Sequence, residues 1–216
     1  MATAPLTRPG YRPRAWRLGT DQAQIYEIPG LLTRPECLEA IEVIDSHVVP
    51  STTLIGRGPH RTSETCVFSL TAARELTQRL DRRFADLVGV EPERSDPLQG
   101  QRYGPGAVFR AHTDWFPPDH PEAARHLAAG GQRTWTVMVY LNAVPAGGTT
   151  LFHRIGRRYD PIPGFALAWN NLLADGTPNP HTLHAGMPVD EGCKYILTKW
   201  FREFVPPPPP APEDVP

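Results

Sequence analysis

The residues best suited to chemistry are His112 and Asp114, which stand two positions apart in a strand-like run. Side chains two apart on an extended strand point to the same face, so this imidazole and this carboxylate can converge on one point. Together they offer a first-row metal ion two ligands of a 2-His-1-carboxylate facial triad. The pair therefore predicts a metal site if the chain supplies a second imidazole.

Two further imidazoles lie in the run His181–Gly186. They are three positions apart, so on one regular strand they face opposite sides, and only one of them can complete the triad. His184 is followed by Ala185 and Gly186, whose small size lets the backbone approach a crowded centre. We therefore predict His184 as the third ligand and His181 as an outer-face residue.

A facial triad leaves coordination positions open on the metal, which a 2-oxo acid and O2 can occupy. A 2-oxo acid with a second carboxylate leads us to expect a cation beside the site. The distal carboxylate of such an acid needs a positive partner. Lys194 shares a predicted strand face with Ile196, Thr198 and Trp200. Burying its ammonium among apolar neighbours is costly without a partner, and a dicarboxylate co-substrate would supply one. Lys199 points to the opposite face and is expected to be a surface charge.

Two amphipathic helices are predicted before residue 90. The first opens with a capping box formed by Thr33 and Glu36 and continues to about His47. The second ends at Gly89, a residue type that favours a left-handed C-cap. Apolar residues at helical spacing define their buried sides, namely Leu38, Ile41 and Ile44 on the first and Leu76, Leu80, Phe84 and Leu87 on the second. These helices are interpreted as packing elements.

From residue 98 onward the apolar pattern becomes strand-like. Short strands are predicted at 98–103, 107–114, 133–141, 149–153, 164–169, 181–185 and 193–201. Many short strands after a helical start indicate a mainly β fold with flanking α, a double-stranded β-helix (jelly-roll) core buttressed by N-terminal helices. The long stretch 115–131 is expected to be either a lid beside the site or a disordered or short-helical insertion on the surface.

The domain organisation follows from these patterns. We expect an N-terminal arm at 1–22, a single domain at 23–205 whose jelly-roll core starts at about 98, and a proline-rich tail at 206–216. Polyproline is a preformed extended ligand, so the tail is also a candidate pseudo-substrate for the groove of its own or a neighbouring molecule.

Composition excludes several function classes. The formal net charge is -1, so no global field recruits nucleic acid or an anionic membrane. No apolar run approaches the ~20 residues that cross a bilayer, and the first residues lack the apolar segment of a signal peptide. The 3 cysteines are odd in number and widely spaced, which favours free thiols in a reducing compartment. We expect a cytoplasmic monomer or homodimer with no nucleic-acid or membrane partner.

Six sequence blocks in one order carry a family resemblance. Residues 60 to 202 resemble the 2-oxoglutarate/Fe(II) dioxygenases of the prolyl 4-hydroxylase type. The blocks are RYGPGAVFRAHTD (102–114), GGQRT (130–134), YLN (140–142), GGTTLF (147–152), PIPGFALAW (161–169) and HAGMPVDEGCK (184–194). Where the family commonly has Gly-Gly-Glu-Thr, this chain has Thr149 in place of the Glu. Because that Glu is not a ligand in the family pattern, we expect altered loop packing and intact iron binding.

The resemblance implies a set of ligands and cofactors. His112, Asp114 and His184 would hold Fe(II), and Lys194 would bind the distal carboxylate of 2-oxoglutarate. The implied cofactors are Fe(II), 2-oxoglutarate and O2, with ascorbate as a possible further requirement. Three more residues would assist in binding 2-oxoglutarate, namely Tyr103, Tyr140 and Thr150.

The resemblance also implies an oxygenase that hydroxylates an unactivated C–H bond, most often C4 of proline in a polypeptide, and releases succinate and CO2. The positions lining a peptide channel would be Arg61, Ser63, Asp96, Phe109, Arg133 and Trp200. Asp96 stands where Glu is usual and Phe109 where Tyr is usual, so two polar contacts differ from the pattern. Two alternatives therefore stay open: the same chemistry on a free amino acid or small natural product, and a catalytically silent polyproline-binding module.

Overall fold

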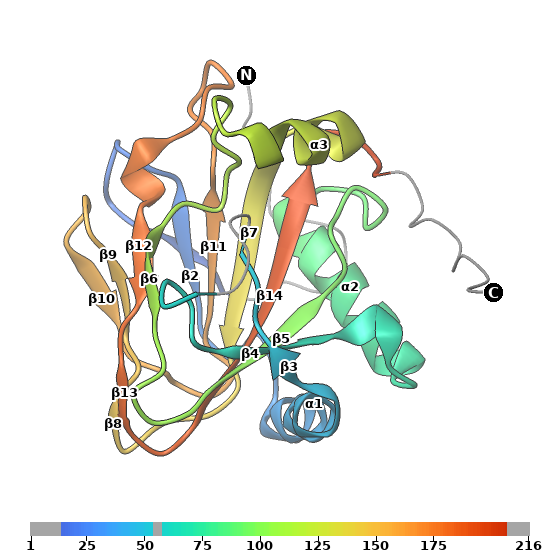
Figure 1. Ribbon diagram of the computed structural model, residues 1–216, viewed down its shortest axis with the longest axis vertical. Coiled ribbons are helices and arrows are strands. Elements are labelled where there is room, and N and C mark those ends of the chain that lie inside the picture. The colour runs from blue at the N-terminus through green and yellow to red at the C-terminus, as the bar shows by residue number, and fades with distance from the viewer. Residues whose placement is uncertain (1–13, 54–57, 207–216) are drawn as a thin grey trace.

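Two antiparallel sheets carry most of the chain in the computed structural model, which describes residues 14–53 and 58–206 (Figure 1). The large sheet contains, in spatial order, β1 (Trp16–Arg17), β2 (Ile25–Ile28), β11 (Ala166–Asn170), β7 (Arg133–Tyr140), β14 (Lys194–Arg202), β5 (Gln99–Tyr103), β4 (Glu64–Val67) and β3 (Val49–Pro50). The small sheet contains β10 (Arg157–Tyr159), β9 (Thr150–Phe152), β12 (His184–Gly186) and β6 (Phe109–His112). A two-stranded ribbon pairs β13 (Val189–Glu191) with β8 (Ala146–Gly147). The predicted mainly β, jelly-roll architecture is confirmed.

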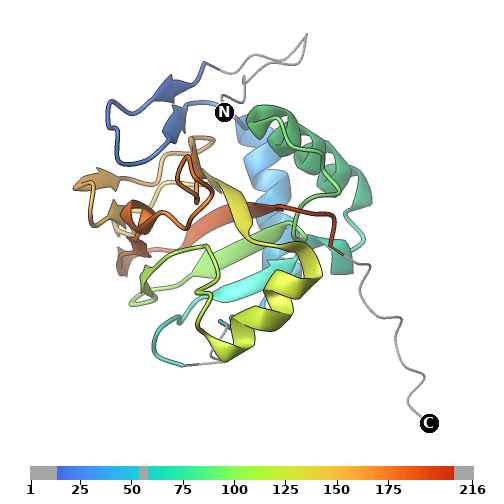
Figure 2. The ribbon, with the colours of Figure 1, turned by 90° about the horizontal axis from the view of Figure 1, so that it is seen from above.

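The N-terminal helices α1 (Arg34–His47) and α2 (Arg74–Val88) cover the outer face of the large sheet, on the side away from the small sheet (Figure 2). Helix α1 begins at the predicted capping box, in which Thr33 and Glu36 each accept from the other's backbone N–H. Helix α2 ends at Gly89, whose φ of 69° is the left-handed conformation that glycine favours. Both predicted helices are therefore confirmed, and the sheet they cover has one face left for the site.

Strand β7 shows how the alternation of a strand divides the core into two layers. Val137 and Val139 belong to the cluster that packs against the helices, whereas Met138 and Tyr140 belong to the cluster between the sheets. This is the two-residue period of a strand buried on both faces. Side chains on the inner face therefore share the space between the sheets, where the candidate site lies.

Two expectations about burial were wrong. Leu38 is 50% exposed, because α1 turns Cys37, Ala40 and Ile44 toward the sheet instead. Lys199 is 2% exposed and its Nζ lies 2.6 Å from Asp81 Oδ1. Its side chain does point away from the site as predicted, but the face it occupies is covered by α2 and not by water.

The connections also differ in detail from the sequence-based expectation. The stretch 115–131 contains helix α3 (Pro121–Gly130), and the predicted strand 181–185 begins instead with the 3-10 helix η2 (Pro180–Thr182). A second 3-10 turn, η1 (Phe68–Leu70), precedes α2, and strands β1, β3, β4, β8, β10 and β13 were not predicted.

Only parts of the two predicted terminal segments are described. Residues 14–22 of the arm include β1, which pairs with β2. Residues 1–13, and all of the proline-rich tail beyond Pro206, lie outside the described residues, so the pseudo-substrate hypothesis stays a prediction. Among the described helices, none is both long and apolar enough to cross a bilayer.

Candidate active site

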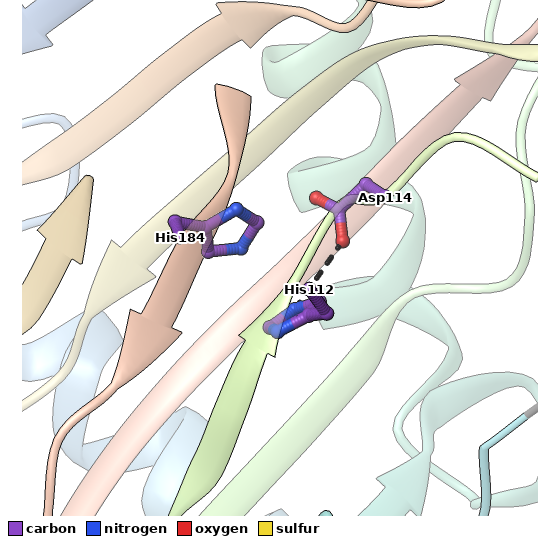
Figure 3. Close-up of side chains that lie close together, drawn as sticks. All are labelled: His112, Asp114 and His184. Carbon is purple, nitrogen blue, oxygen red and sulfur yellow. Dashed lines mark ion pairs between the residues drawn. The ribbon is translucent and has the colours of Figure 1, made fainter. Parts of the chain in front are cut away.

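Three potential metal ligands converge between the two sheets (Figure 3). His112 is the last residue of β6, Asp114 follows it by two positions, and His184 is the first residue of β12. Strands β6 and β12 are neighbours in the small sheet, with His112 and His184 as register partners. One potential ligand atom from each residue lies within 4.8 Å of the other two. The structure therefore brings together the predicted triad and leaves His181 outside it, on η2.

Backbone carbonyls fix the orientation of both imidazoles. The Nδ1 atom of His112 lies 2.8 Å from the carbonyl oxygen of Arg110, and that of His184 lies 2.8 Å from the carbonyl oxygen of Thr182. A carbonyl oxygen can only accept, so Nδ1 carries a proton in each ring and Nε2 is the nitrogen left to bind a metal ion. Each strand thus directs one Nε2 atom toward the candidate site.

A buried hydrogen-bond chain holds the carboxylate. The Thr136 hydroxyl on β7 donates to Asp114 Oδ2 at 2.7 Å, and Asn171 Nδ2 donates to Thr136 Oγ1 at 2.9 Å. The other carboxylate oxygen, Oδ1, lies 3.7 Å from His112 Nε2. The large sheet therefore positions a ligand of the small sheet, which leaves Oδ1 available for a metal.

The charges at the site match a divalent cation. Burial, reinforced by neighbouring His184, lowers the pKa of His112 to about 3, so this imidazole is neutral at physiological pH. Burial opposes ionisation of Asp114, but the two histidines, Arg133 and the Thr136 hydrogen bond outweigh it and lower its pKa. Two imidazoles with one carboxylate are the donor set of mononuclear non-heme Fe(II) sites, so the residues fit that ion.

Lys194 supplies an unpaired buried cation in the same pocket. It is 1% exposed, and its Nζ donates to the carbonyl oxygen of Gly148 at 2.9 Å and lies 4.5 Å from the centre of the Tyr103 ring. Within the described part of the chain, no carboxylate forms an ion pair with it. Burial lowers its pKa to about 8. An uncompensated buried ammonium is expensive, so this pocket favours an anionic ligand.

Glycine geometry allows the chain to approach this ammonium. Gly148 has φ of 71°, and Gly147, with φ of 77°, could not carry a Cβ without a contact of 2.5 Å to the carbonyl oxygen of Pro188. These positions therefore require glycine, which places the Gly148 carbonyl against Lys194. Thr149, which stands where the family commonly has Glu, is buried beside them.

The three residues implied to assist 2-oxoglutarate binding occupy two layers. Tyr103 and Thr150 line the pocket, and Tyr103 is the register partner of Lys194. Tyr140 lies behind them, where its hydroxyl donates to Thr150 Oγ1 at 2.6 Å. Burial raises the pKa of Tyr140, so it remains a hydrogen-bond donor. The geometry gives Tyr140 a positioning role toward Thr150 and no direct contact with the pocket.

The six residues expected to form a substrate channel also divide into two sets. Arg61, Phe109 and Trp200 line the pocket, whereas Ser63, Asp96 and Arg133 do not. The Ser63 hydroxyl accepts from Arg61 Nε at 2.9 Å, and the Arg61 guanidinium lies 4.6 Å from the centre of the Phe109 ring. Ser63 therefore orients the guanidinium that faces the pocket.

A second cluster supports the indole of Trp200. The Arg133 guanidinium lies 4.0 Å from the centre of a Trp200 ring. Asp96 accepts from Arg133 Nε and from Arg202 Nη1, each at 2.8 Å. Burial opposes ionisation of Asp96, but the two arginines hold its pKa below the ordinary value. Asp96 and Arg133 thus fix the pocket wall from behind, a placement that the sequence pattern did not distinguish from direct lining.

Several pocket residues were not singled out as site residues from the sequence. Gln101, Met138 and Trp169 line the pocket. Gln101 shares a strand face with Tyr103, and Met138 shares one with Tyr140, so the two-residue period of a strand indicated both positions. Trp169 is the last residue of the block 161–169. The hydrogen bonds from Asn171 to Thr136 and from Thr136 to Asp114 could not be predicted in this way, because they join distant segments of the chain.

Comparisons with known proteins agree with this geometry. Residues 98–202 match the family model described as the 2OG-Fe(II) oxygenase superfamily. The chain is 36% identical over 129 residues to prolyl 4-hydroxylase subunit alpha-1 of Rattus norvegicus. These aligned residues make up 59% of this chain and 24% of the rat protein. The chain is 34% identical over 128 residues to prolyl 4-hydroxylase subunit alpha-2 of Caenorhabditis elegans. The matched segment thus spans about a quarter of these relatives.

Solved structures show the same fold. Viral collagen prolyl hydroxylase from Paramecium Bursaria Chlorella virus-1, in a 2OG complex, has a TM-score of 0.65 and 25% identity, over 82% of this chain and 95% of the viral chain. A prolyl hydroxylase from Trichoplax adhaerens, in complex with a peptide fragment of the hypoxia inducible factor oxygen degradation domain, has a TM-score of 0.60 and 16% identity, over 83% of each chain. The family match and the ligand geometry agree, and the segment 98–202 belongs to the 2OG-Fe(II) oxygenase superfamily.

Proposed function

We propose that this protein is an Fe(II)- and 2-oxoglutarate-dependent oxygenase that hydroxylates C4 of proline in a polypeptide. The observation that carries the proposal is one pocket with an oriented His-Asp-His set at one end and an unpaired buried lysine at the other. Bound Fe(II), with 2-oxoglutarate and O2, would supply the oxidising power for insertion of one oxygen atom into a C–H bond, with succinate and CO2 as co-products.

The protein's own residues would bind and orient the reactants. His112, Asp114 and His184 would hold the iron, and Lys194 would pair with the distal carboxylate of 2-oxoglutarate beside Tyr103. Thr150, held by Tyr140, would add a hydroxyl contact at the same end of the pocket. The remaining wall excludes water with apolar side chains, which strengthens each of these polar contacts.

A peptide substrate is supported by two residues of the pocket lining and by the relatives. Arg61 presents a guanidinium that can donate to peptide carbonyls, and Trp200, stacked on Arg133, presents a flat apolar face suited to a pyrrolidine ring. The rat and viral relatives are named as prolyl and collagen prolyl hydroxylases. These features favour proline in a polypeptide as the substrate.

The alternative substrate is a free amino acid or small natural product. It is favoured by Asp96, whose two carboxylate oxygens are occupied by Arg133 and Arg202, and by Phe109, which lacks a hydroxyl. Both differences reduce the polar contacts that a peptide channel can offer. A silent polyproline-binding module, in contrast, would not require the intact metal ligands and Lys194.

The test is turnover. Fe(II)-loaded protein is incubated with 2-oxoglutarate and a panel of proline-rich peptides, and the products are analysed by mass spectrometry for the gain of one oxygen atom. We expect hydroxylated peptide with equimolar succinate from the wild type and none from His112→Ala. Succinate release with small amino acids and none with peptides would select the alternative, and peptide binding with no turnover of any substrate would select the silent module.

A further inference from the structure

A buried amide faces the candidate metal site from the large sheet. Gln101 on β5 is 1% exposed and lines the pocket that also contains His112, Asp114 and Lys194. A primary amide taken out of water is costly unless its donors and acceptor find partners. The contacts of Gln101 therefore show which of its groups is left for a ligand.

The oxygen of this amide accepts a hydrogen bond, whereas its nitrogen has only one long contact among the described residues. The Thr198 hydroxyl on β14 donates to Gln101 Oε1 at 2.9 Å, which fixes the orientation of the amide. Gln101 Nε2 has one long contact, 3.4 Å to Gln99 Oε1. Because an amide nitrogen carries two N–H bonds, at least one of them has no hydrogen-bond partner among the described residues. A buried unused N–H in a pocket is a site for an acceptor atom of a ligand.

Strand register places this donor between the lysine and the metal ligands. On β14, Lys194 lies opposite Tyr103 and Ile196 lies opposite Gln101, so Gln101 is one two-residue step, about 7 Å, along the sheet from Lys194. Farther along β14, Trp200 lies opposite Thr136.

Thr136 donates to Asp114, so the metal ligands lie toward this far end of the pocket. A five-carbon 2-oxo acid with its distal carboxylate on Lys194 would therefore extend past Gln101 as it reaches the metal.

We propose that Gln101 donates its unused amide N–H to the iron-proximal carboxylate of the bound 2-oxo acid. Lys194 would hold the distal end of that molecule, while Gln101, oriented by Thr198, holds the chelating end. The proposal rests on the proposed function, because it concerns the same co-substrate. Gln101 is thus assigned as a co-substrate-binding residue and Thr198 as a residue that positions it.

The test separates the two ends of the co-substrate by changing the ligand as well as the protein. Anaerobic Fe(II)-loaded protein is titrated with 2-oxoglutarate and with 2-oxopentanoate, which has a methyl group in place of the distal carboxylate. Binding is read from heat and from the visible charge-transfer band of the chelate, taken to saturation. The variants are Gln101→Met, Lys194→Met and the control Gln78→Met, which makes the same change at an exposed position of α2, away from the pocket.

We expect Gln101→Met to lower the affinity for both 2-oxo acids by the same factor, about tenfold, which corresponds to the loss of one hydrogen bond to a charged acceptor. Lys194→Met should weaken the binding of 2-oxoglutarate and leave the binding of 2-oxopentanoate unchanged, and Gln78→Met should change neither. Equal affinities of wild type and Gln101→Met, or a loss confined to 2-oxoglutarate, would overturn the assignment. Failure of the wild type to bind 2-oxoglutarate at all would instead contradict the proposed function.

Thermal unfolding and iron stoichiometry show whether Gln101→Met still forms the site. If it does not, Thr198→Val decides the question, because it keeps the amide and removes only the hydroxyl that orients it. An equal loss for both acids in Thr198→Val supports the assignment, and unchanged binding of both overturns it.

Discussion

At the scale of single residues, Lys194 is the group whose charge pH controls. Its pKa in the free protein is about 8, lowered by burial. As pH rises through that value, the lysine loses the proton that attracts a carboxylate, whereas the carboxylates of 2-oxoglutarate remain ionised throughout. The affinity for 2-oxoglutarate is therefore constant below about pH 7 and declines above pH 8.

The decline should approach about tenfold per pH unit, because one proton must then be taken up with each ligand. Calorimetric titrations at a series of pH values measure it. The matched control is Lys194→Arg, whose guanidinium stays charged, so any binding it retains should be independent of pH over this range. A parallel decline in Lys194→Arg would assign the pH dependence to another group.

The hydroxyl of Thr136 is the other residue whose contribution can be isolated. Thr136→Val keeps the shape of the side chain and removes the donor to Asp114 Oδ2. Loss of such a contact behind a metal ligand costs about 10- to 100-fold in metal affinity. Chelator-competition titration with Fe(II) measures the change, with Thr134→Val as the control on the same strand. Unchanged affinity in Thr136→Val would show that the carboxylate needs no support.

At the scale of elements, the ion pair between Lys199 and Asp81 joins β14 to α2 across the helix-covered face of the sheet. Asp81 is partly exposed and Lys199 is buried. Removing only the acid by Asp81→Asn leaves a buried charge unpaired, so we expect a loss of about 2 kcal/mol in the free energy of unfolding. Urea denaturation at neutral pH measures it.

The double variant Asp81→Asn/Lys199→Met provides the control for that prediction. Removing the buried ammonium as well removes the unpaired charge, so the double variant should be more stable than Asp81→Asn alone. If the loss of stability in the double variant equals the sum of the losses in Asp81→Asn and Lys199→Met, the two side chains are not coupled.

Sequence patterns predicted the elements well where the signal was local. The Thr33–Glu36 capping box predicted the start of α1, and the two-residue period of β14 predicted that Lys194 lies on the face of the site, where it lines the pocket. The same period turned Lys199 away from it, but whether that face meets water or a helix depends on the packing of layers. The prediction that Leu38 lies on the buried side of α1 was wrong for a related reason, because the residues that a helix buries depend on the elements it contacts.

At the scale of the whole molecule, the site joins the two sheets. His112 and His184 belong to the small sheet, Lys194 and Gln101 belong to the large sheet, and Thr136 links the two through Asp114. The two-residue period of the strands, together with the family resemblance, predicted the triad and the lysine. It could not predict the hydrogen-bond chain of Asn171 or the ion pairs of Asp96, because those contacts join segments that meet only in the folded chain.

A ligand that bridges the sheets should stabilise the fold. At about 100 times its Kd a ligand adds about 2.7 kcal/mol, which corresponds to a rise of about 5–10 °C in Tm for a chain of this size. We expect 2-oxoglutarate to give such a rise on top of that given by Fe(II), as measured by anaerobic thermal unfolding. Lys194→Ala should keep the iron-induced rise and lose most of the second one at the same 2-oxoglutarate concentration.

The most direct test of the ligand assignment is equilibrium dialysis of Fe(II) and 2-oxoglutarate against the wild type, Asp114→Ala and Lys194→Ala under anaerobic conditions. The expected result is one Fe(II) and one 2-oxoglutarate per wild-type chain, loss of both in Asp114→Ala, and retention of iron with weakened 2-oxoglutarate in Lys194→Ala. Iron bound at full stoichiometry by Asp114→Ala, or 2-oxoglutarate bound equally well by Lys194→Ala, would contradict the account.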